Sequence, residues 1–156
     1  KGVEFQLQAL LLDGLRLRTS VGLLDTEYKD YRDDIGNDYS GASFARAPKA
    51  SAVIGLDYTL GLSSGDLVLG SDINARSNFH FSSTQINDAR QHHAGYTLVN
   101  VRASWKFHQL PLQITAYIDN VGDKIYSQAT SPQGPDVIGY ALGAPRTYGL
   151  SAQYSW

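Results

Sequence analysis

The chain has 156 residues, a formal net charge of −2, and neither cysteine nor methionine. This charge excludes the basic field that nucleic-acid binding needs, and the missing cysteine excludes disulfides, thiolate zinc sites and thiol catalysis. No segment approaches the run of roughly 18 to 20 apolar residues that a membrane helix requires. Ten tyrosines and fifteen glycines are instead typical of a β protein with many turns.

Apolar and polar side chains alternate along successive segments, which is the period of a strand that has one face against an apolar medium. The first two segments are joined by Asp13-Gly14, a strong signal for a two-residue hairpin turn. Helical periodicity is absent. The sequence therefore predicts an all-β antiparallel up-and-down meander of about seven strands. In chain order, the predicted strands are residues 2–12, 15–24, 51–60, 67–79, 97–107, 112–120 and 148–156.

The predicted connections alternate between short and long. The short turns are Asp13-Gly14, 61–66 and 108–111, and the long polar loops are 25–50, 80–95 and 121–145. In a meander, this alternation places the short turns at one end of the sheet and the long loops at the other. Outer-membrane barrels have this arrangement, with short periplasmic turns and long external loops.

The two predicted faces differ in charge. The face that carries Val99, Val101, Ile114 and Leu150 holds no charged residue in any predicted strand. A charge facing lipid near the bilayer midplane costs roughly 2 to 4 kcal/mol, so this face suits a membrane wall, although a soluble sandwich core would also lack charges. We expect the arginines and the lysine of the opposite face to pair with its aspartates or to contact a plug. That face carries Glu4, Arg16, Arg18, Asp57, Asp72, Arg76, Arg102, Lys106 and Asp119.

Aromatic side chains lie near both ends of the uncharged face, and two such bands predict the aromatic girdles of a membrane barrel. The alternative is a soluble β domain with aromatic residues at the ends of its core. Tyr58, Trp105, Phe107, Tyr154 and Trp156 fall near the short turns, and Phe79 and Tyr148 fall near the long loops.

Three stretches resemble parts of a known family. Residues 149–156, Gly-Leu-Ser-Ala-Gln-Tyr-Ser-Trp, resemble the C-terminal assembly signal of outer-membrane barrels, through Gly149, Tyr154 and Trp156. Residues 117–126, Tyr-Ile-Asp-Asn-Val-Gly-Asp-Lys-Ile-Tyr, resemble a segment near the end of TonB-dependent receptors, although Val-Gly replaces the usual Leu-Phe. Residues 143–149, Gly-Ala-Pro-Arg-Thr-Tyr-Gly, resemble the start of the last strand of those receptors. The matching positions are Asn120, Asp123, Tyr126, Pro145 and Arg146, and we expect structural roles for them.

The resemblance implies that residues 1–156 form the C-terminal portion of a barrel of roughly 22 strands, without the plug domain and the earlier strands. The first residue, Lys1, fits a processed chain, a separate subunit or a fragment. The implied location is the outer membrane of a Gram-negative bacterium. The implied partners are outer-membrane lipid and lipopolysaccharide, the rest of the barrel with its plug, TonB through the plug-bearing part, and the barrel-assembly machinery.

The implied function is energised uptake of a scarce ligand, a ferric siderophore or other iron complex, without enzymatic activity or a cofactor. The alternatives are a passive pore, an enzymatic or adhesin barrel that shares the assembly signal, an uptake receptor for a carbohydrate, vitamin or aromatic compound, and a soluble ligand-binding β domain. Candidate ligand contacts in the second long loop are Arg90, His92, His93 and Tyr96. An acidic cluster at Asp25, Glu27, Asp30, Asp33 and Asp34 either binds cations or forms a solvated loop; it lacks the EF-hand pattern, and no metal site is predicted.

Overall fold

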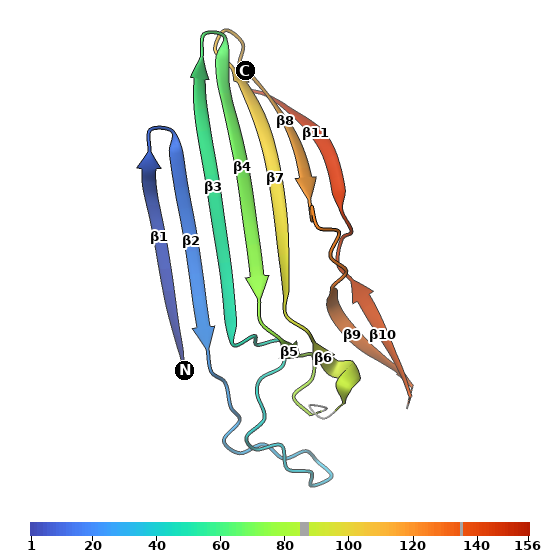
Figure 1. Ribbon diagram of the computed structural model, residues 1–156. Helices are drawn as coiled ribbons and strands as arrows, with labels where there is room; N and C mark the ends of the chain where they lie inside the picture. Colours follow the sequence, from blue (N-terminus) through green and yellow to red (C-terminus); the bar gives the residue numbers. More distant parts are fainter. Residues whose placement is uncertain (85–87, 135) are drawn as a thin grey trace.

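A computed structural model gives the fold, and it describes residues 1–84, 88–134 and 136–156. Its main feature is one seven-stranded antiparallel sheet in the order β1-β2-β3-β4-β7-β8-β11 (Figure 1). This confirms the predicted meander, since each strand coincides with a predicted one to within a few residues. The strands are β1 (Gly2–Leu12), β2 (Leu15–Leu24), β3 (Ala50–Leu62), β4 (Gly65–Arg76), β7 (Tyr96–Phe107), β8 (Leu112–Asp119) and β11 (Thr147–Tyr154).

The connections separate by length as predicted. In Figure 1 the short turns lie together at the upper end of the sheet and the long connections at the lower end; we call these the short-turn end and the long-loop end. At the first turn, Gly14 has φ +79°, which favours glycine. A Cβ on Gly14 would also lie 2.4 Å from the carbonyl oxygen of Thr59 in β3. Both the backbone conformation and the lack of space therefore require glycine at this turn.

The register places the predicted faces as expected. One row across the strands after β1 reads Leu17, Leu56, Ser71, Val101, Ile118 and Tyr148, each paired with the next, and none is charged. The neighbouring row includes Arg18, Gly55, Asp72 and Asn100. We call the first face the apolar face and the second the polar face.

The apolar face has no second layer over it. The buried hydrophobic residues of the described chain are Ala42, Phe79 and Phe81, none of which belongs to the seven-stranded sheet. Ile114 is 40% exposed and Leu150 is 77% exposed. A soluble sandwich would bury this face against another layer, and the described residues provide no such layer. Within the described residues, no helix is long and apolar enough to cross a membrane.

Short elements occupy two of the predicted irregular loops. The second long connection contains β5 (Phe79–His80), a 3₁₀ turn η1 (Ala89–Gln91) and β6 (His92–His93), and the third contains a hairpin of β9 (Ser127–Gly134) and β10 (Val137–Leu142). Sequence reasoning missed them because β5 and β6 are too short to show a period and β9 includes proline and glycine.

The predicted strand at 67–79 was too long, and Phe79 is not a girdle residue. The strand β4 ends at Arg76, where the chain leaves the sheet. The ring of Phe79 is buried against Phe81 and His93. Apolar and polar residues continue to alternate through Phe79 in the sequence, but tertiary packing places this ring among the loop residues instead of on the apolar face.

Candidate functional site

A network of alternating charges spans the polar face. The Nη2 of Arg18 in β2 donates to Asp57 Oδ2 at 3.1 Å and to Asp72 Oδ1 at 3.2 Å. Arg102 in β7 pairs with the same two carboxylates. The side chains keep between 19% and 42% of their surface exposed. The network therefore carries no net charge and ties together four adjacent strands, β2, β3, β4 and β7.

Two glycines make room for this network. A Cβ on Gly55 would lie 2.9 Å from Arg18 Nη2 and 2.9 Å from Asp72 Oδ1. A Cβ on Gly70 would lie 2.7 Å from Arg102 Cζ and 2.8 Å from Asp57 Oδ1. All four distances are too short for a real Cβ, so the guanidinium groups lie directly on the bare backbone of the intervening strands.

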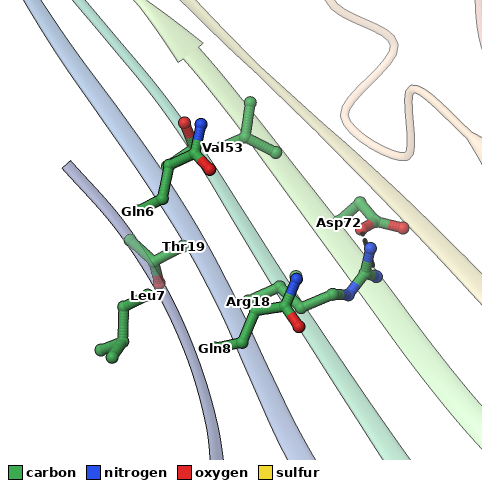
Figure 2. A pocket seen from close by; sticks show the side chains of 9 residues that line it. Gln6, Leu7, Gln8, Arg18, Thr19, Val53 and Asp72 are labelled. Carbon is green, nitrogen blue, oxygen red and sulfur yellow. Dashed lines mark hydrogen bonds and ion pairs between the residues drawn. The ribbon is translucent and has the colours of Figure 1, made fainter. Parts of the chain in front are cut away.

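A hollow of about 500 Å³ lies between the network and the edge strand β1. Figure 2 shows Gln6 and Gln8 on one side of β1, toward Arg18, and Leu7 on the other side. The polar lining consists of the amides of Gln6 and Gln8, the hydroxyls of Thr19 and Ser20, and the paired charges of Arg18 and Asp72. This arrangement suits contact with water or with another polar segment, and the lining offers no activated nucleophile.

The sequence predicted that cations and aspartates of this face pair, but not which of them meet. Of the polar-face charges, Arg18 and Arg102 meet Asp57 and Asp72. Within the described chain, ion pairs do not form at the other polar-face charges that we expected to pair, namely Arg16, Arg76, Lys106 and Asp119. The glycines that permit the network were missed, because register is needed to place them between the charges.

At the long-loop end, a cluster of rings surrounds His93. Its ring stacks on Phe79 with centroids 5.0 Å apart and planes 3° apart, and it lies edge-on to Phe81. His93 Nε2 accepts a hydrogen bond from the backbone N–H of Ser127 at 2.9 Å, and Nδ1 lies 2.6 Å from the carbonyl oxygen of Ala94. A neutral ring that is protonated at Nδ1 satisfies both contacts.

His80 and His92 form a second pair, with ring centroids 5.2 Å apart. His92 Nε2 accepts from Asn78 Nδ2 at 3.3 Å, whereas the buried His80 Nδ1 has no partner within the described residues. Burial, and then the nearby His92, lower the pKa of His80 below its ordinary value of 6.5. His80 is therefore held neutral under conditions where a free histidine would begin to protonate.

Arg90 joins the second long connection to the β9–β10 hairpin. Its guanidinium forms a bidentate pair with Asp88 and donates through Nη1 to the carbonyl oxygen of Asp136 at 2.9 Å. The hydroxyl of Tyr140 donates to the carbonyl oxygen of Arg90 at 2.9 Å. The hydrogen bonds to Asp88 lower the pKa of that carboxyl. These contacts hold the hairpin against the loop.

The four predicted ligand-contact residues lie near one another but differ in availability. Arg90 and His93 are engaged in the loop–hairpin junction. His92 is exposed, and Tyr96 stacks on Tyr126 with ring centroids 4.9 Å apart. The sequence did not reveal this division, because the β9–β10 hairpin that engages two of them was not predicted.

Asn120 ties three backbone segments together. It is buried, with φ +51°. Its Nδ2 donates to the carbonyl oxygens of Lys124 at 3.0 Å and Ala144 at 3.1 Å, and its Oδ1 accepts from Lys124 N–H at 2.9 Å. Its own N–H donates to Asn100 Oδ1 of β7. The side chain thus connects the end of β8 to the approach to β11.

The neighbouring motif residues make similar local contacts. Asp123, also at positive φ (+50°), accepts from Arg146 N–H at 3.0 Å. Tyr126 covers Gly143, where a Cβ would lie 2.0 Å from the ring. Pro145 lies between Ala144 and Arg146, both of which take part in these hydrogen bonds.

The residues of the resembled assembly signal lie on the edge strand β11 or just beyond it. Gly149 lies beside Tyr117, whose Oη would be 2.7 Å from a Cβ at that position. Tyr154 is exposed on the apolar face, and Trp156, beyond the end of β11, is fully exposed at 105%.

The acidic loop forms a turn. Asp33 accepts from Asn37 N–H at 2.8 Å, from Asn37 Nδ2 at 2.7 Å and from Ile35 N–H at 3.1 Å. Hydrogen bonds from Asn37, above all, lower the pKa of Asp33. In the part of the chain that the structure describes, no group of three histidine, cysteine, aspartate or glutamate side chains could hold a metal ion.

Comparison with known proteins gives one family match. The sequence profile described as "TonB dependent receptor-like, beta-barrel" matches residues 1–121, which covers β1 to β8.

Solved structures of similar shape include the ferric yersiniabactin uptake receptor FyuA from Yersinia pestis, with a TM-score of 0.78, 16% identity and coverage of 97% of this chain. BauA, the ferric preacinetobactin receptor from Acinetobacter baumannii, has a TM-score of 0.76, 28% identity and the same coverage. The ferric-catecholate import receptor Fiu from E. coli K12 has a TM-score of 0.74 and 16% identity, again over 97% of this chain. The matches cover 22%, 21% and 20% of those receptors, so this chain spans about a fifth of each.

Proposed function

The chain belongs to the TonB-dependent receptor family of β-barrels, and from this premise we propose that it forms wall and external loops of a receptor for a ferric siderophore or another iron complex. The family consists of transport proteins of the Gram-negative outer membrane rather than enzymes. The apolar face of the sheet therefore meets lipid, and the polar face lines the lumen.

One observation carries the proposal: the seven-stranded sheet is a single layer, uncharged and exposed on one face and polar on the other. Its edge strands, β1 and β11, would leave unpaired backbone groups in lipid, at several kcal/mol each. We propose that further strands of the same barrel pair with both edges and that a plug fills the lumen beside the polar face. TonB would act through that plug-bearing part.

The proposed ligand class rests on the solved structures. Those of similar shape are described as ferric siderophore uptake receptors, at 16% to 28% identity. These identities support the iron-complex proposal without distinguishing one siderophore from another. A carbohydrate, vitamin or aromatic compound remains the competing class of cargo.

We further propose that residues 1–156 are the C-terminal portion of the receptor. In this proposal, Gly149, Tyr154 and Trp156 are read by the barrel-assembly machinery as β11 is added to a sheet edge. Asn120, Asp123, Tyr126, Pro145 and Arg146 position β11 relative to β8, and lipopolysaccharide contacts the outer rim of the apolar face. The contacts of Asn120 with Ala144 and of Asp123 with Arg146 support the positioning role.

The test is uptake by cells that carry or lack the gene of the parent receptor. Iron-starved cells receive a panel of siderophores loaded with radioactive iron, and a strain without TonB serves as the control. Uptake of at least one siderophore should require both the receptor and TonB. If no iron complex depends on the receptor, the ligand class is wrong; if receptor-dependent uptake persists without TonB, the protein is a passive pore.

A further inference from the structure

A second hollow lies on the polar face at the long-loop end, away from the charge network. Its volume is about 410 Å³, within the range of small-molecule sites, which is roughly 300 to 1,000 Å³. It lies between the chain leading into β3, the end of β4, the start of β7 and the start of β9. Its lining includes the side chains of Arg46, Arg76, Tyr96, Tyr126, Asn74 and Gln128.

Arg46 and Arg76 line this hollow without a carboxylate partner. Within the described chain, neither guanidinium makes a hydrogen bond or an ion pair. By contrast, Arg18 and Arg102 are neutralised by Asp57 and Asp72. An anion that enters the hollow therefore meets two guanidinium groups whose donors are not already taken by a carboxylate.

The backbone fixes both arginines at the rim of the hollow. Arg76 is the last residue of β4 and is paired in register with Tyr96, so it lies on the polar face. Arg46 has φ +57°, a left-handed conformation that is unfavourable for a residue with a side chain. Its N–H donates to the carbonyl oxygen of His80 at 2.8 Å, which holds this conformation in place. Strained residues of this kind are concentrated at binding sites.

Stacked rings form another wall of the hollow. Tyr96 and Tyr126 lie with ring centroids 4.9 Å apart and planes 26° apart. The ring of Tyr126 is held against the bare backbone of Gly143, which limits its movement. Rings fixed beside guanidinium groups favour a flat ligand, because such a ligand can stack while its carboxylate takes two parallel hydrogen bonds from an arginine.

We propose that this hollow binds an aromatic ring bearing a carboxylate, as part of a small anion that diffuses into the external mouth of the lumen. The inference rests on the proposed function, because it takes the polar face to be the lumen. Arg46 and Arg76 hold the carboxylate, Tyr96 and Tyr126 hold the ring, and the amides of Asn74 and Gln128 bind further polar substituents. The competing occupant is an acidic side chain of the plug.

The test measures binding of salicylate to the purified parent receptor in detergent micelles, by titration calorimetry. Inorganic phosphate and benzyl alcohol serve as an anion without a ring and a ring without a charge. Salicylate should bind more tightly than either. Arg46→Gln and Arg76→Gln should each weaken salicylate binding by about 3- to 10-fold, as expected for a lost charged hydrogen bond that is partly solvated. Tyr126→Leu should weaken it by about threefold or more.

Arg16→Gln is the matched control, since Arg16 is also on the polar face and unpaired within the described residues, but lies near the short-turn end. It should leave salicylate binding unchanged. Equal weakening by Arg16→Gln would indicate a diffuse positive field, and phosphate binding as tight as salicylate would indicate a simple anion site. Either result overturns the proposal. Each variant is first checked for the heat-modifiable gel migration of a folded barrel.

Two further outcomes separate this inference from the function itself. If the Arg46→Gln/Arg76→Gln double variant binds salicylate like the wild type, the inference fails, whatever the uptake assay shows. If that variant instead loosens the plug, measured as faster proteolysis of the plug without any change in salicylate binding, the hollow holds a plug carboxylate. If the receptor takes up no iron complex but binds salicylate in a way that depends on the two arginines, the site is upheld and the transport proposal is refuted.

Discussion

Arg18 of β2 reaches Asp72 of β4 across the backbone of Gly55, which lies between them in register on β3. Asp57 of β3 reaches Arg102 of β7 in the same way, across Gly70 of β4. Each ion pair thus joins strands that are not neighbours. Each of these two pairs can form because the glycine between its partners has no side chain to block the contact.

Gly55→Val should therefore destabilise the barrel. The new side chain would occupy the space of the Arg18 guanidinium, and overpacking of this kind costs about 1 to 3 kcal/mol. The measurement is the midpoint of heat-modifiable unfolding of the parent receptor. Gly61→Val is the matched control, since the nearest atom to a Cβ there is 3.8 Å away. An equal loss in both variants would mean that strand glycine alone, and not the network, matters.

Asp72→Leu should leave two guanidinium groups short of a partner. Loss of one member of a fully buried pair costs about 3 to 5 kcal/mol; here we expect about 1 to 2 kcal/mol, because partial exposure lets water screen the charges. The double variant Arg18→Leu/Asp72→Leu should recover part of this loss. Urea-unfolding midpoints of the single and double variants form the cycle, and strict additivity would show that Arg18 and Asp72 are not coupled.

Asn120→Ala should loosen the connection between β8 and β11. The substitution removes the hydrogen bonds to Lys124 and Ala144 and places alanine at φ +51°, with an expected cost of about 2 to 4 kcal/mol. Asn120→Gly relieves the backbone but still loses the side-chain bonds, so it should be intermediate. Limited proteolysis between residues 120 and 147 reports the effect. Equal cleavage of the alanine variant and the wild type would contradict a positioning role.

Mild acid should loosen β5 and its surroundings. Because the pKa of His80 is lower in the folded chain than its unfolded value of 6.5, its stabilising contribution is fully present above pH 6.5 and is lost as pH falls toward the folded pKa. Amide exchange in residues 79–84 should therefore be faster at pH 5.5 than at pH 7.5, after correction for intrinsic rates. His80→Phe should remove most of this difference; if it does not, another group causes the loosening.

Trp156→Ala should reduce the amount of receptor assembled in the outer membrane, under the proposal that residues 149–156 form the assembly signal. Trp156 is fully exposed, so its loss should have little effect on the stability of barrels that do assemble. Heat-modifiable receptor in membrane fractions gives the yield, with Ser155→Ala as the control. A normal yield for Trp156→Ala would remove this residue from the signal.

The residues of the candidate sites were only partly predictable. Arg18, Asp57, Asp72 and Arg102 were placed on one face because alternation alone assigns faces. Alternation cannot say which charges meet, since that depends on register between strands far apart in the sequence. The hollow at Arg46 depends on still longer-range contacts: His80 fixes the backbone of Arg46, and Tyr126 arrives from the third long connection.

The sequence by itself determined the seven strands of the main sheet, their two faces and the separation of short turns from long loops, because all three follow from a period of two residues and from local turn chemistry. It also led to the family, through residues close to one another in the chain. Only the tertiary structure decided that the apolar face lies uncovered, that Gly55 and Gly70 lie beneath ion pairs, and that Phe79 and His93 are packed inside the loops. Those features depend on which distant segments come into contact, and a local sequence pattern does not determine such long-range contacts.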